Sequence, residues 1–395
     1  MQPLIISAFT LTNCLGRGLN ATSAALREQR SGLRHCDFPG TELDTYIGRI
    51  DGIENEPVSG RLSDYDCRNN RLARIGLEQD GFVQAVESAR RRYGPERIAV
   101  ILGTSTSGIL ETESAYRRRN PETGALPPDF RYRQTQNTFS VGDFTRRYLD
   151  LQGPASVVST ACSSSSKVFA SAARLIQTGL CDAAVVGGVD SLCFTTLYGF
   201  TALELVSSTP CRPADADRNG ISIGEAAGFA LLEKPERGTG DIALLGYGES
   251  TDAYHMSSPH PDGLGAAEAM NKAMQRAGID PGAIDYINLH GTATKANDAA
   301  EDKAVSGIFG AAVPCSSIKG WTGHTLGAAG IVNVIVGCLS IRENFVPRSL
   351  NTERVDPEIA SWIATEELRR PVRTVLCNAF GFGGNNASLV LGKRS

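Results

Sequence analysis

Short apolar runs recur along the chain, and small-residue turns and helical stretches separate them. The runs lie at residues 98–103, 155–160, 182–188, 242–247, 284–290, 313–318 and 374–380. Helical stretches lie between them, such as residues 265–277 and 298–309, the second of which opens with a capping-box pattern at Asp298 and Glu301. Continuous apolar runs that alternate with helices are typical of strands buried on both faces. The pattern therefore predicts an α/β fold.

A polar segment at residues 234–240 divides the chain into two parts. We expect one unit over residues 1–240 and a second over residues 241–395, and the length fits two units or one large duplicated unit. No sequence repeat is visible across the break. The arginine-rich stretch at residues 117–133 is predicted to leave the core.

Composition narrows the classes of function. The 39 basic and 43 acidic residues give a net charge of −4, which argues against a general nucleic-acid binder. Ten cysteines without a CxxC pair favour free thiols in a reducing cytoplasm. An apolar run at residues 3–9 follows no basic segment, so it predicts a first strand rather than a signal peptide. We find no apolar stretch near ~18 residues and expect no membrane span.

Cys162 is the first candidate for chemistry. It lies where an apolar run ends and a helical stretch begins, so the positive end of the helix dipole would favour its thiolate. Small neighbours at residues 159–166 leave room for a substrate. A buried structural cysteine is an equally good interpretation of this local context, because the chain has nine others.

Two histidines occupy similar places. His290 ends an apolar run, and His324 lies in a glycine-rich segment at residues 319–330. Both stand at exits from strands to loops, where the sites of open α/β sheets collect. A single histidine is more often structural, but two such exits together with Cys162 form a constellation.

Four segments around these residues resemble the signatures of β-ketoacyl-acyl-carrier-protein synthases. They read STACSSS at 159–165, HGTAT at 290–294, KGWTGHTLGAAG at 319–330 and NAFGFGGN at 378–385. Residues 211–225 and 251–259 also resemble that family, so the likeness covers nearly the whole chain. It implies a thiolase-like fold, in which two similar βαβ-rich halves form a five-layered α-β-α-β-α arrangement that is usually dimeric. The half at 1–240 would carry the nucleophile and the half at 241–395 the histidines.

The second histidine separates classes within this superfamily. Cys-His-His is the pattern of elongating synthases, whereas initiating synthases have asparagine in place of one histidine. Degradative thiolases use a second cysteine, and residues 379–384 contain none. A noncatalytic chain-length-factor subunit would lack the nucleophile, whereas Cys162 is present.

The resemblance implies a decarboxylative condensation. Cys162 would accept an acyl chain from a carrier thioester, and malonyl carrier protein would then lose carbon dioxide and attack it. Backbone N–H groups of Cys162 and Phe382 would form the oxyanion hole, and the Phe382 ring would gate the site. His290 and His324 would donate N–H groups to the enolate, and Lys319 would act electrostatically. The hydroxyls of Thr292 and Thr294 would bind the pantetheine arm.

Partners and pathway follow less directly. Substrates would arrive on the phosphopantetheine of an acyl carrier protein, and we expect no other cofactor and no metal. Arg68, Arg71 and Arg212 resemble carrier-docking positions, with a plain solvated surface as the alternative. Thr106 falls near the acyl pocket, where the family often has a larger aliphatic residue.

One departure from the family concerns residue 333. Elongating fatty-acid synthases usually carry glutamate there, within reach of the lysine, and this chain has Asn333. The change leans toward a specialised aryl polyene or type II polyketide system over primary fatty-acid elongation. In such a system the chain would pair with a chain-length-factor-like paralogue, so both a homodimer and a heterodimer stay open.

Two other classes of function also stay open at this stage. A cysteine protease using Cys162 and His290 would lack a papain-like sequence context and would leave His324 unexplained. A noncatalytic partner subunit would not need Cys162 together with both histidines.

Overall fold

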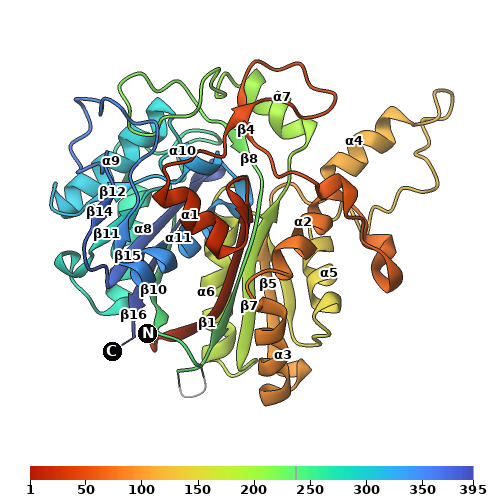
Figure 1. Cartoon of the computed structure of the whole chain (residues 1–395), viewed down its shortest axis with the longest axis horizontal. Helices are drawn as coiled ribbons and strands as arrows, with labels where there is room; N and C mark the ends of the chain where they lie inside the picture. The colour runs from red at the N-terminus through yellow and green to blue at the C-terminus, as the bar shows by residue number, and fades with distance from the viewer. Residues whose placement is uncertain (236–237, 395) are drawn as a thin grey trace.

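The computed structural model describes residues 1–235 and 238–394 (Figure 1). The predicted break at 234–240 includes residues 236 and 237, which lie outside the described residues. The main strands of the N-terminal half are β1 (Leu4–Asn13), β5 (Ile98–Gly103), β6 (Ala155–Val158), β7 (Ala183–Asp190) and β9 (Ala226–Glu233). Those of the C-terminal half are β10 (Ile242–Thr251), β11 (Tyr286–Asn288), β12 (Cys315–Ser316), β15 (Thr374–Gly381) and β16 (Asn385–Lys393).

Helices connect these strands in both halves. In the first half they are α1 (Leu19–Arg27), α2 (Arg68–Leu77), α3 (Phe82–Tyr93), α4 (Ile109–Arg117), α5 (Ser140–Tyr148), α6 (Ser164–Gln177) and α7 (Phe194–Ala202). In the second half they are α8 (Leu264–Ala277), α9 (Lys295–Phe309), α10 (Lys319–Thr322) and α11 (Ala329–Glu343). Short strand pairs lie outside the main sheet and include β4 (Tyr46–Gly48) with β8 (Ile223–Gly224).

The two halves repeat one strand order. It is β6-β5-β7-β9-β1 in the first half and β12-β11-β15-β16-β10 in the second, which is third, second, fourth, fifth and first in both. In both halves the first three of these strands are parallel and the next two pairings are antiparallel. β1 and β10 join the halves by antiparallel pairing at Leu4–Leu244 and Ile5–Ala243. The repeat lies in the topology, although the sequence shows none.

Alternate strand residues face two different cores. On β5, Ala99 and Ile101 face a central core with α6 and α11, whereas Val100 and Leu102 face an outer core with α2, α3 and α5. The second half does the same, because Leu376 of β15 belongs to an outer core beneath α8 and α9. Helices therefore cover the outer face of each half-sheet, and another layer of helices lies between the two half-sheets. This confirms the α/β fold and the five-layered arrangement that the resemblance implied.

One apolar segment escaped the sequence analysis. Residues Leu326–Glu343 are long and apolar enough to cross a membrane, with a mean hydropathy of 1.5, so the expectation that no such stretch exists was wrong. The segment is 89% buried inside the protein, as the core-facing helix α11. Its composition is therefore explained by its place in the central layer.

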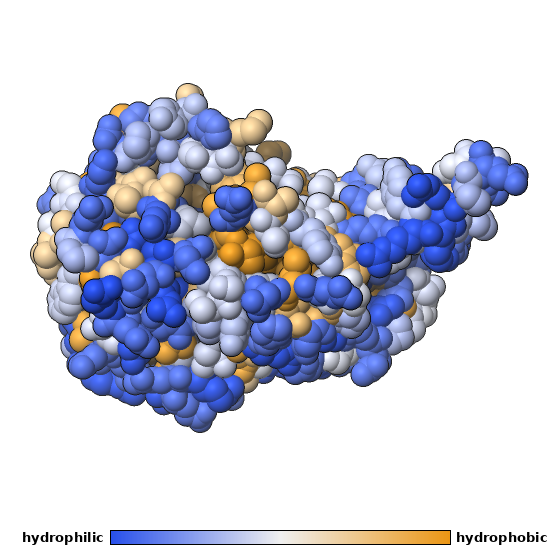
Figure 2. Space-filling model, turned by 90° about the horizontal axis from the view of Figure 1, so that it is seen from above, coloured by the Kyte–Doolittle hydropathy of each residue, from blue (hydrophilic) through white to orange (hydrophobic). Residues whose placement is uncertain are grey.

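The arginine-rich stretch does leave the core. α4 and the chain that follows it project to the right in Figures 1 and 2, and Figure 2 shows this arm as mainly hydrophilic. Tyr116, Tyr132 and Phe139 on this segment are exposed.

Candidate active site

Cys162 sits at a sharp turn between β6 and α6. Ala161 adopts a left-handed conformation with φ of 50°, which only a locally constrained turn imposes on a residue with a side chain. α6 then begins at Ser164, so Cys162 lies just before its first turn, as predicted. The side chain is buried and lines a cavity of about 460 Å³.

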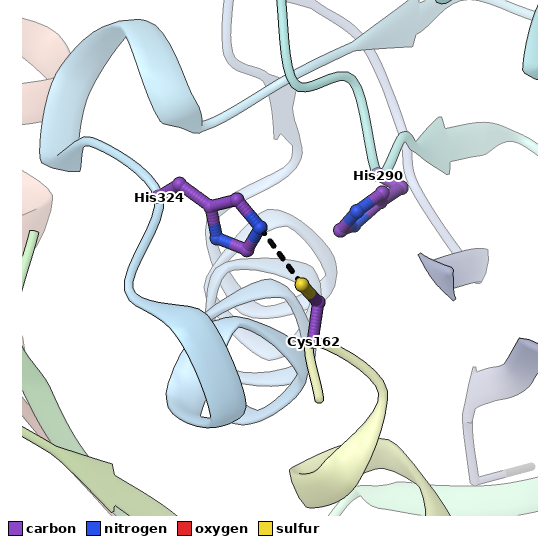
Figure 3. Close-up of side chains that lie close together, drawn as sticks. All are labelled: Cys162, His290 and His324. Carbon is purple, nitrogen blue, oxygen red and sulfur yellow. Dashed lines mark hydrogen bonds between the residues drawn. The ribbon is translucent and has the colours of Figure 1, made fainter. Parts of the chain in front are cut away.

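His324 faces the cysteine from the second half of the chain. Its Nε2 atom lies 3.1 Å from Cys162 Sγ (Figure 3). The backbone N–H of Leu326 donates to His324 Nδ1 at 3.1 Å, so the ring proton belongs on Nε2. Leu326 is itself left-handed, with φ of 52°, and this turn brings its N–H to the ring. The imidazole thus presents an N–H group to the sulfur.

His290 is held in the same tautomer by a different donor. The ammonium group of Lys319 lies 3.4 Å from His290 Nδ1 and also donates to the His290 carbonyl oxygen. The proton of His290 therefore belongs on Nε2 as well. The two histidine rings are 5.4 Å apart, edge to face, and the sulfur and one nitrogen of each ring lie within 4.8 Å of one another (Figure 3).

Electrostatics keep both rings neutral. Burial and the charge of Lys319 lower the pKa of His290 and His324 well below the ordinary value. Burial also raises the pKa of Cys162 to about 11, while Lys319 and the backbone N–H of Phe382 lower it. The helix-start argument predicted a thiolate, but desolvation is the larger effect. The resting group is a thiol with thiolate-stabilising donors around it.

Glu301 is a site residue that the sequence analysis assigned to a helix cap. Its carboxylate accepts hydrogen bonds from the backbone N–H groups of His290 at 2.8 Å and Gly291 at 2.7 Å, and it is buried. The capping-box prediction was wrong, because α9 begins at Lys295 and Thr294 caps it by accepting from Asn297. Glu301 lies eleven residues after His290 in the sequence, and no motif connects the two positions.

Lys319 is buried without a carboxylate within 4.0 Å among the described ion pairs. Burial lowers the pKa of Lys319 to about 8, and the nearby charge of Glu301 opposes that shift. Burial also raises the pKa of Glu301 to about 7. Asn333 supplies no charge here, since its Nδ2 donates to the carbonyl oxygens of Leu289 at 3.1 Å and Asn378 at 2.9 Å. The carboxylate of Glu301 is therefore the strongest acidic influence on the pKa of Lys319.

The Cys162–His290–His324 cluster has the residue types of a metal site but the wrong protonation. A metal-bound histidine donates its other ring N–H to an acceptor. Here the far nitrogen of each ring instead accepts a hydrogen bond, from Leu326 in one case and Lys319 in the other. If Nε2 bound a metal, the ring proton would move to Nδ1. It would then face the proton that Leu326 or Lys319 already donates to that nitrogen. The arrangement favours N–H donation into the cavity over metal binding.

The cavity leads from the surface to Cys162. Thr292 and Thr294, the predicted pantetheine residues, both line it, and their hydroxyl oxygens lie 2.9 Å apart. Phe382 lines it too, with its ring centroid 5.7 Å from that of Phe200. Gly383 has φ of 79°, so the chain beside Phe382 adopts a conformation that glycine permits at little cost. Phe200 and Phe380, which the sequence analysis did not select, complete the apolar wall.

Thr106 is not brought to this cavity. Its side chain is buried, and its hydroxyl donates to the carboxylate of Asp190 at 3.0 Å. The lining of the Cys162 cavity in this chain does not include it. The predicted acyl-pocket role therefore finds no support in a single copy of the chain.

Two of the three predicted docking arginines are paired with carboxylates of the chain itself. Arg68 is only 5% exposed and its guanidinium pairs with Glu225 and Glu54, both at 2.6 Å, so the prediction that it docks a carrier protein was wrong. The physical reason is that a partly buried helix such as α2 can hide a charge when a buried carboxylate faces it. Arg71 is tied to Asp66 at 2.6 Å, and Arg212 is half-buried.

Comparisons with known proteins give matches over most of the chain. Residues 1–237 match the model of the beta-ketoacyl synthase N-terminal domain, and residues 242–353 match that of the C-terminal domain. A 3-oxoacyl-[acyl-carrier-protein] synthase 2 of Vibrio cholerae is 31% identical over 411 residues, which cover 98% of each chain.

Two solved structures have nearly the same fold. A ketosynthase (ApeO) in complex with its chain length factor (ApeC) from Xenorhabdus doucetiae is 40% identical, with a TM-score of 0.89 over 99% of this chain and 98% of that one. The ishigamide ketosynthase/chain length factor is 27% identical, with a TM-score of 0.90 over the whole of both chains.

Proposed function

This chain belongs to the β-ketoacyl synthase family, and from that premise we propose which residues carry out its condensation. It is an acyltransferase-type condensing enzyme, as the sequence predicted, and it joins a malonyl unit to an acyl chain held on the enzyme. The observation that carries the assignment of roles is the Cys162 sulfur facing two neutral imidazoles at the end of a cavity that Thr292 and Thr294 line.

Acyl transfer comes first. The sulfur of Cys162 attacks the carbonyl carbon of a carrier thioester, a new C–S bond forms, and the carrier's C–S bond breaks. The thiol proton ends on the departing carrier sulfur, so the step balances without an added reactant. Backbone N–H groups of Cys162 and Phe382 stabilise the oxyanion, because both groups donate toward the Cys162 sulfur and lower the pKa of its thiol.

Condensation follows on malonyl carrier protein. The malonyl carboxylate leaves as carbon dioxide, and the electron pair of the broken C–C bond forms an enolate. The enolate oxygen accepts hydrogen bonds from the Nε2–H groups of His290 and His324. The enolate carbon attacks the acyl-Cys162 carbonyl, a C–C bond forms, and the bond to sulfur breaks. The thiolate then takes one proton from solvent. Because both rings are neutral donors, they stabilise the oxygen without protonating the carbon.

Competing enzyme classes account for the site less well. A cysteine protease needs its histidine as a base at the sulfur, but in both His290 and His324 Nδ1 accepts a hydrogen bond and Nε2 carries the proton. A noncatalytic subunit would not need a cysteine and two histidines within 4.8 Å.

Carrier protein and a related chain are the partners. The relatives act on acyl carrier protein or assemble with a chain length factor, as their names state. We propose that this chain works as a heterodimer with a chain-length-factor-like paralogue in a specialised pathway. Two similar structures are complexes of this kind, and Asn333 departs from the elongating fatty-acid pattern. We further propose that it needs no cofactor and works in the cytoplasm, where its ten free cysteines would stay reduced.

The test is product analysis. Purified chain, alone and with a co-expressed paralogue, is mixed with malonyl carrier protein and a series of acyl carrier proteins, and products are identified by mass spectrometry. We expect β-ketoacyl carrier products, with elongation beyond one cycle only for the pair. Efficient elongation of ordinary saturated acyl carriers by the chain alone would contradict the specialised pathway, whereas no condensation under any condition would contradict the assigned roles.

A further inference from the structure

We propose that Asp190 is a positioning residue that holds the Cys162 turn and the His324 loop at a fixed separation. The inference rests on the roles proposed for Cys162 and His324, but it concerns a residue that touches neither substrate nor the reacting atoms. Asp190 ends β7, is fully buried, and accepts hydrogen bonds from the loop after β5 and from the loop that carries His324.

One oxygen of Asp190 organises the loop after β5. Its Oδ1 accepts from the Thr104 hydroxyl at 2.6 Å, the Ser105 N–H at 2.8 Å, and the Thr106 N–H and hydroxyl, both at 3.0 Å. Ser105 in turn donates through Oγ to the carbonyl oxygen of Ala161 at 3.2 Å. Ala161 is the left-handed residue that directly precedes the nucleophile. This chain of contacts connects the carboxylate to the Cys162 turn.

The other oxygen reaches across to the second half of the chain. Asp190 Oδ2 accepts from the N–H of Gly327 at 2.5 Å. Gly327 follows Leu326, whose N–H fixes the His324 ring. A Cβ atom on Gly327 would lie 2.8 Å from Asp190 Oδ2 and 2.7 Å from Ser105 Oγ, so only glycine allows this close approach. The same carboxylate therefore bridges both partners of the Sγ–Nε2 pair.

Two opposing effects act on the charge of Asp190. Burial raises the pKa of its carboxyl group above the ordinary value, whereas the hydrogen bonds donated by the Thr104 hydroxyl and by the N–H groups of Ser105, Thr106 and Gly327 favour the carboxylate. No described cation lies within 4.0 Å of it, although burial of an unpaired charge is costly. The Thr106 hydroxyl helps to offset that cost, and this gives residue 106 a role outside any acyl pocket.

The first test is Asp190→Asn. The amide keeps one acceptor oxygen but sets an N–H₂ group against a backbone N–H, so the contact to one loop is lost while side-chain size is kept. We measure acyl-Cys162 formation and condensation separately, with thermal unfolding of both proteins. We expect condensation to fall at least tenfold and acylation to change by less than threefold. The wild-type protein must condense in the same assay, and its failure would concern the proposed roles rather than Asp190.

Asp302→Asn is the matched control. Asp302 is also buried and accepts from Ser361 N and Oγ and from Ala360 N, but it lies outside the Cys162 cavity. We expect this variant to lose stability without a change in the ratio of condensation to acylation. If the ratio of condensation to acylation fell equally in both variants, the loss of any buried carboxylate would have the same effect. That result would overturn the proposal.

A second pair of variants applies even if Asp190→Asn does not fold. Thr106→Val removes one hydroxyl donor to Asp190, whereas Thr106→Ser keeps it. We expect Thr106→Val to lower condensation three- to tenfold relative to acylation and Thr106→Ser to retain most of the wild-type condensation. Identical behaviour of valine and serine would contradict a role through the hydroxyl bond, as would unchanged condensation in Asp190→Asn.

Discussion

At the residue scale, the imidazoles of His290 and His324 are both fixed by donors to their Nδ1 atoms. Leu326 fixes His324 through a neutral N–H, and Lys319 fixes His290 through an ammonium group. The two rings are therefore equivalent in proton position but not in electrostatic environment. His324 lies against the sulfur, and His290 lies next to the buried charge.

His290→Ala and His324→Ala should each lose condensation more severely than acylation. The enolate needs both N–H donors, and loss of one such donor typically costs about a hundredfold or more in rate. Acylation keeps the backbone donors of Cys162 and Phe382 at the sulfur. Rapid-quench assays with labelled acyl carrier and malonyl carrier separate the two steps. Wild-type condensation in either variant would show that its role is wrong.

Alkylation of Cys162 should rise with pH from neutrality. The pKa of the thiol is raised to about 11, so the thiolate fraction grows about tenfold for each pH unit as long as Lys319 keeps its charge. The charge of Lys319 lowers that pKa, and the pKa of Lys319 itself is lowered to about 8, so the rise should flatten near pH 8 as the ammonium group deprotonates.

Lys319→Met isolates this effect. Without the charge, the thiol pKa goes up and alkylation at pH 7 slows by about tenfold for each unit of pKa. Peptide mass spectrometry after iodoacetamide treatment reports Cys162 separately from the other nine cysteines. Lys303→Met, which removes an exposed lysine bonded to Pro261, is the control and should match wild type. Equal rates in both variants would remove the electrostatic role of Lys319.

Sequence predicts the residues of the site better than their surroundings. Cys162, His290, His324 and Lys319 come from motifs whose glycines and small residues mark tight loops. Glu301 and Asp190 were missed because each acts on backbone N–H groups brought near only by the fold. Arg68 was misassigned for a related reason, since Glu225, its buried partner, lies 157 residues away in the chain.

At the scale of elements, the contact between α6 and α11 builds the central layer. The first turns of these helices approach closely at Gly330. A Cβ atom there would lie 2.3 Å from Ser166 Oγ and 2.6 Å from Ser166 N. These first turns also lie beside the loops that carry Cys162 and His324.

Gly330→Ala should therefore destabilise the protein. Overpacking of this kind typically costs about 1–3 kcal/mol, and here part of the clash is with backbone. Gly307→Ala is the matched control, because that glycine also lies in a helix but has open space where a Cβ would be. Higher helix propensity should leave Gly307→Ala equal to wild type or more stable by up to about 1 kcal/mol. Chemical unfolding of both variants gives the comparison, and a Gly330→Ala protein as stable as Gly307→Ala would contradict this packing.

The hydrophobic pattern of the sequence predicts some elements and gives no signal for others. The runs at 98–103 and 374–380 became β5 and β15 with nearly the expected bounds. α11 was not predicted, because its residues from Ala329 to Ile341 are all buried and no polar face reveals a helical period. The duplicated strand order was also invisible, since it depends on pairing between distant strands rather than on repeated residues.

At the scale of the whole molecule, we expect an assembly of two chains. The projecting arm, α4 and the chain that follows it, exposes Tyr116 and Tyr132, and the similar structures include a ketosynthase in complex with a chain length factor. Light scattering of the chain alone and of the chain co-expressed with a related paralogue should give two-chain masses. A stable and fully active monomer would contradict this expectation.

The proposed reaction depends on one covalent intermediate, the acyl chain on Cys162. Intact-protein and peptide mass spectrometry should follow the protein after addition of acyl carrier protein and then of malonyl carrier protein. We predict an acyl adduct on Cys162 that forms in the first step and disappears in the second as β-ketoacyl carrier protein appears, with no adduct in Cys162→Ala. An adduct of unchanged yield in Cys162→Ala, or condensation product without any adduct on Cys162, would contradict the account.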